Sequence, residues 1–295
     1  MPGKGPLNVL CCYIAWGLLP LFWRLLKSVG SFAVLGYRIV FSLVFITVFL
    51  ALSGHLQDAA AMLRDKAERR RLMLSGAAVA INWGGYIWAV SGGHVVDASL
   101  AYYMYPILSI LVGALFFREK LTALQWVAVA LMSAGIVVTA VGYGQIPWLA
   151  LLIGGSFVLY GVLKRSVTSN SAVTLFGESL FTLPIALICI GWSEWGGSGA
   201  FGVLGGAQWL LLPAAGIVTA LPLLFFSQGI RTTSNTLAGI LMLINPTLQL
   251  LVGVLVLGEA FTAAHGILFA FIWSGLALFV AGNVTRNRRN AAKAM

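Results

Sequence analysis

The chain has few charged residues, and very few of them are acidic. Only 9% of the 295 residues are charged, with 8 Asp and Glu against 18 Lys and Arg, whereas an ordinary soluble domain has about 25% charged residues. Apolar residues make up 60% of the chain, and the mean hydropathy is +0.96. This composition cannot cover a globule in water, so we expect the protein to be embedded in lipid.

Residues that commonly bind metals or carry redox chemistry are also scarce. The three cysteines, Cys11, Cys12 and Cys189, lie in apolar stretches, and the sequence has no CxxC or His/Cys spacing typical of a metal site. It has no Walker motif, no GxGxxG sequence after a strand and no soluble nucleotide-binding domain, which argues against a pump driven by ATP. We therefore expect structural thiols, no metal site and no cofactor.

What the chain has instead is a series of long apolar runs. A transmembrane helix needs about 20 apolar residues to cross roughly 30 Å of hydrocarbon. The runs are apolar throughout rather than alternating, which favours helices over the strands of a membrane barrel. The predicted spans are 7–27, 32–52, 72–90, 97–117, 122–141, 146–163, 172–192, 208–228, 235–257 and 263–282. The predicted fold class is an all-α integral membrane protein with these ten transmembrane helices.

Basic residues occur in alternate connections between the spans. Fifteen of the 18 Lys and Arg residues lie in the amino-terminal tail, in every second loop or in the carboxyl-terminal tail; the other three are Arg24, Lys27 and Arg38. Cytoplasmic loops carry an excess of Lys and Arg, so both termini are predicted to be cytoplasmic. The net charge of +10 then reflects topology, and no nucleic-acid partner is expected. The basic connection 53–71 is expected to form a short amphipathic surface helix or a basic loop.

The chain contains an internal repeat. Shifting the sequence by 140 residues aligns 98–142 with 238–282 without a gap, and thirteen of these 45 positions are identical. The matched residues include Pro106 and Pro246, Glu119 and Glu259, Gly135 and Gly275, and Gly142 and Gly282. Because this offset spans an odd number of predicted helices, the two halves must cross the membrane in opposite senses.

The repeat defines the predicted organisation. We expect a first five-helix repeat over 1–142, a second, inverted five-helix repeat over 143–285, and a basic cytoplasmic tail over 286–295. Inverted repeats of this kind are typical of secondary transporters, whose substrate site lies near the middle of the bilayer where the halves meet.

Several segments distributed over the whole chain form a recognisable pattern. In the first half they are AWGLLPLFWR (15–24), GYRIVFS (36–42), INWGGYIWAV (81–90) and DASLAYYMYPILSILVGALFFREKL (97–121). In the second half they are GES (177–179), GIVTALPLLFF (216–226), INPTLQLLVGVLVLGE (244–259) and FAFIWSGLALF (269–279). With these segments the chain resembles the drug/metabolite transporter superfamily in its EamA branch, and most closely the RarD group.

This resemblance implies a basket-like bundle in the bacterial inner membrane that acts as a permease or exporter. It implies that the first, third, fourth, sixth, eighth and ninth helices line a central cavity, with the fifth and tenth outside. RarD-like proteins are named for chloramphenicol sensitivity, but the name does not identify a substrate.

Two charged residues, Arg38 and Glu178, stand out because each lies six or seven residues inside a predicted span, where a central charge costs roughly 2.5–3.5 kcal/mol. One interpretation makes Glu178 a proton-coupling carboxylate and Arg38 an anchor for a substrate carboxylate, with a gate at each face. The other makes both structural polar groups near helix ends. The repeat pairs Arg38 with Glu178 and Arg24 with Lys164, so Arg24 joins Glu178 as a candidate for coupling or gating. We expect no direct salt bridge between Arg38 and Glu178, because they lie toward opposite faces.

Amide and aromatic side chains within the spans are candidates for contact with small amphipathic solutes, since Tyr and Trp combine an apolar face with a polar tip. The predicted substrate-binding residues are Trp16, Arg38, Asn82, Trp83, Tyr86, Tyr102, Tyr103, Gln228, Asn245 and Gln249. Tyr105 belongs to the same aromatic surface. Packing against helices or lipid is the alternative for each aromatic residue, whereas Asn82 is expected to face inward.

Two matched pairs have candidate structural or gating roles. Pro106 and Pro246 free backbone carbonyls and are candidate hinges or simple packing bends. Glu119 and Glu259 precede the helices at 122–141 and 263–282, where an acidic group is expected to stabilise the helix start.

We therefore predict a secondary transporter of small amphipathic metabolites or drugs, working by alternating access, with proton exchange through Glu178 left open. Its partners would be a small-molecule substrate, protons and the lipid bilayer, and it would be a monomer or a homodimer. The alternative is a polytopic membrane enzyme acting on lipid or lipid-linked substrates. It is disfavoured because His55, His94 and His265 are scattered in the sequence and no acid/base pair stands out.

Overall fold

The computed structural model describes residues 4–116, 121–143, 147–164, 166–230, 233 and 241–294. Within these ranges all regular structure is helical. The long helices are α1 Lys4–Leu25, α2 Ser31–Leu52, α4 Lys66–Ser91, α5 Val95–Phe116, α6 Ala123–Tyr143, α7 Trp148–Lys164, α8 Ser171–Trp195, α9 Leu211–Ile230 and α12 Ala263–Ala294. The shorter elements are α3 Leu56–Arg64, η1 Gly206–Leu210, α11 Ile244–Leu251 and η2 Val252–Val256.

Seven segments of the described chain are long and apolar enough to cross a membrane, and α7 and the α11–η2 segment are shorter apolar helices. The protein is thus an all-α, multi-pass membrane protein. Part of the predicted span 235–257 lies outside the described residues.

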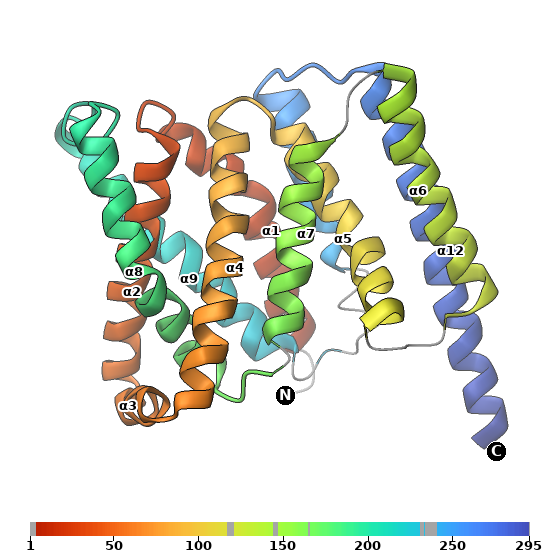
Figure 1. Cartoon of the computed structure of the whole chain (residues 1–295), viewed down its shortest axis with the longest axis horizontal. Helices are drawn as coiled ribbons and strands as arrows, with labels where there is room; N and C mark the ends of the chain where they lie inside the picture. The colour runs from red at the N-terminus through yellow and green to blue at the C-terminus, as the bar shows by residue number, and fades with distance from the viewer. Residues whose placement is uncertain are drawn as a thin grey trace.

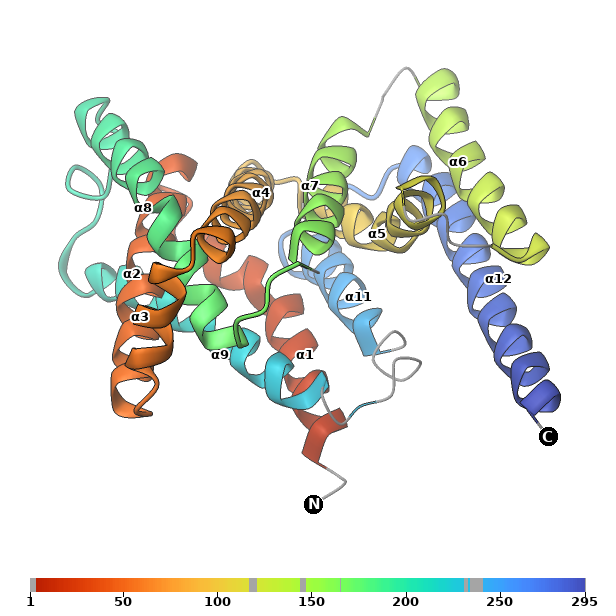
Figure 2. The same ribbon diagram turned by 60° about the horizontal axis from the view of Figure 1, so that its bottom comes forward.

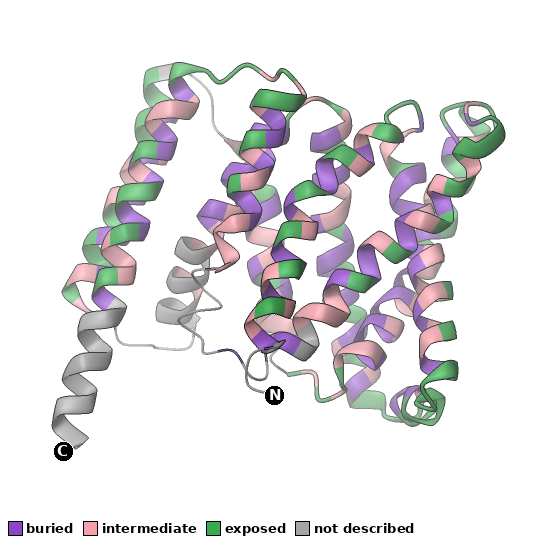
Figure 3. Cartoon of the chain, turned by 180° about the vertical axis from the view of Figure 1, so that it is seen from behind, coloured by how far each residue is buried: buried purple, intermediate pink, exposed green. Residues whose placement is uncertain are grey.

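The helices stand side by side in an open bundle. In Figure 1, α6 and α12 form one edge, α2 and α8 form the opposite edge, and α1, α4, α5 and α7 lie between them. α1 begins and α12 ends near the lower edge of this view, where α3 also lies. In the turned view of Figure 2, α9 and α11 are seen apart from the helices that lie in front of them in Figure 1. Buried residues concentrate on the central helices, while α6 and the coloured part of α12 keep many exposed residues (Figure 3).

Glycines allow the closest approaches between paired helices. A Cβ at Gly135 of α6 would lie 2.5 Å from the Cβ of Phe271 on α12, and one at Gly275 would lie 2.2 Å from Met132 Cγ on α6. The two glycines are equivalent positions of the internal repeat. Each lies at the contact between its own helix and the neighbouring one. Small residues at such contacts let membrane helices pack without a side chain between the backbones.

Helix α4 begins six residues before the predicted span. Its N-cap is Asp65, whose Oδ1 accepts hydrogen bonds from the backbone N–H groups of Ala67 at 2.8 Å and Glu68 at 3.2 Å. This cap extends the helix through the basic run 69–71. Of the two alternatives predicted for 53–71, the surface helix is present as α3.

The prolines differ in their local effect. α5 runs without interruption through position 106, whose side chain lies outside the described residues. Pro246 lies in the first turn of α11, which begins after a turn at Leu243. Proline cannot donate to the carbonyl four residues earlier, here that of Met242, which accounts for the interruption at this point.

Glu259 joins two segments far apart in the sequence. Its carboxylate accepts backbone hydrogen bonds from Val95 at 3.0 Å and Val96 at 2.9 Å, the first two residues of α5. It therefore caps α5 in the first half of the chain, a contact that the sequence did not predict. Glu119 lies outside the described residues.

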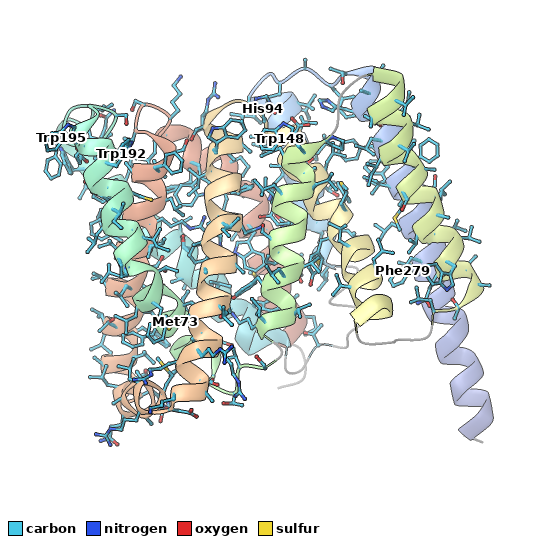
Figure 4. All side chains as sticks on the ribbon, in the orientation of Figure 1. Met73, His94, Trp148, Trp192, Trp195 and Phe279 are labelled. Carbon is cyan, nitrogen blue, oxygen red and sulfur yellow. The ribbon has the colours of Figure 1, made fainter. Side chains whose placement is uncertain are left out.

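Tryptophans mark the upper edge of the bundle. Figure 4 labels Trp192 and Trp195 at the upper end of α8, and Trp148 at the upper end of α7. All three side chains are more than half exposed. Exposed tryptophans at helix ends are typical of the membrane–water interface.

Candidate functional site

A cavity of about 310 Å³ lies among the central helices. Its wall is mainly aromatic and aliphatic, with a few polar groups, as is usual for small-molecule sites. It is lined by Tyr13, Trp16, Leu19, Arg38, Val79, Asn82, Trp83, Tyr86, Tyr102, Tyr105, Phe157, Tyr160, Gly161, Lys164, Ser171, Leu175, Thr219, Leu223, Phe226, Met242, Asn245 and Gln249.

Arg38 is the charged group most deeply enclosed in this wall. It lies on α2 and is 5% exposed, and its guanidinium carbon is 5.0 Å from the ring centroid of Trp23 and 4.1 Å from that of Trp83. Its Nε and Nη1 are buried without a hydrogen-bond partner. The two tryptophan rings stabilise the cation, by about 0.5–2 kcal/mol each.

Glu178 is held by a polar cluster beside the cavity. It is 2% exposed and lies 3.5 Å from the Nζ of Lys164. Ser75 and Tyr160 donate hydrogen bonds to its carboxylate at 2.9 Å and 3.2 Å, and Lys164 also contacts the Tyr160 hydroxyl. The cluster joins α4, α7 and α8. Glu178 does not itself line the cavity, but Tyr160 and Lys164 do.

Three amide side chains contribute to the wall from both halves of the chain. The Nδ2 of Asn82 donates to the carbonyl of Ile153 at 2.8 Å, which ties α4 to α7. On α11, the Nε2 of Gln249 donates to the Oδ1 of Asn245 at 2.7 Å, since the two residues are one helical turn apart. The Oε1 of Gln249 is buried and has no hydrogen-bond partner.

Aromatic rings make a continuous surface along α5 and α7. The Phe157 ring lies 6.1 Å from Tyr102, 5.0 Å from Tyr105 and 6.0 Å from Tyr160, measured between centroids. Tyr86 extends this surface to α4, with its ring 5.9 Å from that of Tyr102. The Tyr86 hydroxyl is buried without a partner.

The structure brings most of the predicted substrate-binding residues into this one cavity. Those that line it are Trp16, Arg38, Asn82, Trp83, Tyr86, Tyr102, Asn245 and Gln249. Tyr103 points elsewhere, with its hydroxyl 2.6 Å from the Oγ1 of Thr247. The side chain of Gln228 lies outside the described residues.

The predicted coupling and gating residues lie around the cavity rather than in its wall. Arg24 is in the last turn of α1 and Pro246 is buried in α11, and neither lines the cavity. Glu178 does not line the cavity, but it contacts the wall residues Lys164 and Tyr160. The side chain of Pro106 lies outside the described residues.

Several residues of the cavity wall were not identified from the sequence. Tyr13, Tyr160, Lys164 and Phe226 line the cavity but were not singled out. Lys164 and Tyr160 are four residues apart at the end of α7, a spacing that places them on one helix face and could have indicated the pair. α2 and α8 also contribute wall residues, in addition to the helices implied by the resemblance.

The histidines are less scattered in the structure than in the sequence. His94 Nδ1 and His265 Nε2 each lie 3.3 Å from an oxygen of Asp97. These three residues gather near the start of α5 and the start of α12, and none of them lines the cavity. Two of the three histidines, which are far apart in the sequence, therefore lie near one another in the structure.

Comparisons with known proteins agree with this fold. The model of the EamA-like transporter family matches residues 3–141. The "Uncharacterized transporter YojE" of Bacillus subtilis is 39% identical over 97% of this chain and 96% of its own length. "Protein RarD" of Escherichia coli is 30% identical over 98% and 97%, and "Chloramphenicol-sensitive protein RarD" of Pseudomonas aeruginosa is 32% identical over 94% and 93%. A crystal structure that is 19% identical superposes with a TM-score of 0.60, covering 95% of this chain and 98% of the other.

The fold and these similarities define a membrane transporter. The chain belongs to the EamA-like transporter family, in its RarD-like group of permeases. The family and the names of the relatives suggest a permease rather than an enzyme.

Proposed function

We propose that the chain is a secondary transporter that moves small amphipathic metabolites or drugs across the bacterial inner membrane by alternating access. In this proposal ten helices cross the membrane as two inverted five-helix halves, over 1–142 and 143–285, with both termini cytoplasmic. The substrate binds in the cavity where the two halves meet.

The observation that carries this proposal is that equivalent positions of the two halves line the same cavity. Five pairs of wall residues are separated by the 140-residue offset of the sequence repeat. They are Val79 and Thr219, Trp83 and Leu223, Tyr86 and Phe226, Tyr102 and Met242, and Tyr105 and Asn245. A site built from paired positions is what two related halves facing one another would produce.

The helix packing supports the same proposal. Three pairs of elements begin 140 residues apart: Ser31 and Ser171, Lys66 and Gly206, and Ala123 and Ala263. α1 packs against α9, and their equivalents α7 and α4 pack against each other. α2 packs against its own equivalent α8, and α6 against α12. Exchanging the two halves therefore reproduces these contacts.

The cavity extends further toward one side of the bundle than toward the other, which supports alternating access. Lys164 and Ser171, at the connection between α7 and α8, line the cavity. Their equivalents Arg24 and Ser31, near the connection between α1 and α2, do not. The connection between α7 and α8 lies at the lower edge of Figure 1, and the connection between α1 and α2 lies at the upper edge. We propose that this arrangement is open to the cytoplasm, and that the other state opens the equivalent path past Arg24.

We further propose that Glu178 couples transport to protons. Its charge is balanced by Lys164, which lines the cavity. Protonation of Glu178 would break this pair and leave a free ammonium at the cytoplasmic end of the cavity. Such a change would alter substrate release, and this would link proton binding to the direction of transport.

A flux experiment tests the proposed function. The purified chain is first screened by thermal shift against amino acids, nucleosides, small organic acids and antibiotics, because a ligand that binds the folded state stabilises it. Any stabilising ligand is then assayed for uptake into proteoliposomes. We expect saturable uptake that Asn82→Ala abolishes and Ile81→Ala, on the exposed face of the same helix, preserves. Uptake that Asn82→Ala leaves intact, or no uptake of any bound ligand, would contradict the proposal.

A further inference from the structure

We propose that the substrate is a small organic anion, with a carboxylate bound at Arg38 and an apolar or aromatic body. This inference rests on the proposed transport function and names the chemistry of the solute. It excludes the organic cations that a purely aromatic cavity would also attract.

The first argument is the charge of the wall. Among the described residues, Arg38 and Lys164 are the only charged side chains that line the cavity, and both are basic. Lys164 is paired with Glu178 at 3.5 Å. Arg38 has no carboxylate within ion-pair distance in the described part of the chain. The cavity therefore carries one uncompensated positive charge, which repels a cation and attracts an anion.

The second argument is the unused hydrogen-bonding capacity at this charge. A buried guanidinium without acceptors is costly, because it has lost its hydration and gained no counter-charge. The Nε and Nη1 of Arg38 are both in this position, and the hydroxyl of Tyr86 is a third buried donor without an acceptor. A carboxylate accepts strong, charge-assisted hydrogen bonds from guanidinium N–H groups, and it can accept an O–H group as well. It therefore supplies the counter-charge that Arg38 lacks and acceptors for donors of this kind.

The other wall residues indicate the shape and polarity of the rest of the ligand. The wall includes the rings of Trp83, Tyr102 and Phe157, which favour a flat apolar body. The unpaired Oε1 of Gln249 is an acceptor and calls for one donor elsewhere on the ligand. The volume of about 310 Å³ is at the lower end of the usual range for ligand sites, about 300–1,000 Å³. The solute is thus small, with one ring or a short chain.

Three compounds with one shared body test this inference on the full-length protein. They are 4-hydroxyphenylacetate, its neutral amide 4-hydroxyphenylacetamide, and the cation tyramine. Binding is measured by calorimetry and thermal shift in detergent. We expect the carboxylate to bind at least tenfold more tightly than the amide, and tyramine not to bind saturably. An amide that binds as tightly as the acid, tighter binding of tyramine, or no saturable binding of the acid would overturn the inference.

Variants locate the preference at Arg38. Arg38→Gln should reduce the ratio of acid to amide affinity to near one while leaving amide binding in place, and Arg38→Lys should restore part of the ratio. Lys27→Gln removes an exposed basic residue outside the cavity and should change nothing. A ratio that survives in Arg38→Gln would overturn the assignment, and the comparison of the three compounds on the unaltered protein stands even if that variant does not fold.

Flux measurements separate this inference from the proposed function. If the amide or tyramine is bound best and is carried into proteoliposomes, the chain is a transporter and the anion assignment is wrong. If the acid binds through Arg38 but no compound is transported, the anion site stands and the transport function is wrong.

Discussion

The guanidinium carbon of Arg38 lies 4.1 Å from the ring centroid of Trp83, so the cation of α2 rests on an aromatic ring of α4. At the equivalent position of the second half stands Leu223. Trp83→Leu should therefore weaken substrate binding about fivefold to thirtyfold, since a desolvated cation–π contact contributes about 1–2 kcal/mol. Trp83→Phe, which keeps a ring, should lose less. Titration of the bound substrate by calorimetry measures both, and Trp88→Leu, on the exposed face of α4, serves as the control. Equal affinity in Trp83→Leu and the unaltered protein would show that the ring does not support the site.

The ion pair of Glu178 with Lys164 gives a second prediction. Glu178→Gln should remove the pH dependence of flux in proteoliposomes, because the amide cannot release or take up a proton. Flux is measured over a series of internal and external pH values. Glu68→Gln is a matched control, since Glu68 is equally buried but accepts hydrogen bonds from Thr168 and Ser169 away from the cavity. Unchanged pH dependence in Glu178→Gln would remove Glu178 from proton coupling.

The cap that Glu259 provides to α5 should contribute to stability and not to binding. Glu259→Ala leaves two backbone N–H groups without an acceptor, which should lower the free energy of unfolding by about 1–2 kcal/mol. Thermal unfolding in detergent detects this as a lower Tm, and Glu259→Gln, which keeps one acceptor oxygen, should lose less. Substrate affinity should stay the same in both. An unfolding transition in Glu259→Ala equal to that of the unaltered protein would argue against the cap.

The contact between α6 and α12 depends on small residues. Gly135→Ala places a methyl group 2.5 Å from Phe271, so the helices must move apart, with an expected loss of about 1–3 kcal/mol of stability. Gly142 is a matched control on α6, because a Cβ there would meet nothing within 4 Å. The comparison of Tm values between Gly135→Ala and Gly142→Ala isolates the contact. Equal stability of the two variants would contradict close packing at this point.

Some helix starts could be predicted from the sequence, because apolar runs begin at them. The predicted span 32–52 starts one residue after the start of α2, and the predicted span 263–282 starts at the first residue of α12. The start of α4 was placed too late, because the basic run 69–71 was assigned to a loop and the Asp65 cap was not considered. Amphipathic ends of membrane helices are therefore where apolar periodicity alone fails.

The cavity could be predicted in part, because an amide or a charge in a lipid environment must face inward. This argument selected Arg38, Asn82 and Asn245, which all line the cavity. It could not select the partner of Glu178, because Lys164 lies at a helix end and reads as an ordinary loop charge. It also could not separate Tyr102 from Tyr103, since adjacent aromatics in one helix differ only in the direction that packing gives them.

Sided labelling of two cysteines tests the central claim most directly. Ser31 begins α2 and Ser171 begins α8, and the internal repeat makes the two positions equivalent. In a chain whose native residues Cys11, Cys12 and Cys189 are replaced, a cysteine is placed at one position or the other and intact cells are treated with a membrane-impermeant thiol reagent. Two inverted halves predict that the external reagent labels Ser31→Cys and that only a permeant reagent labels Ser171→Cys. Labelling of both cysteines from the same side of the membrane would contradict the account.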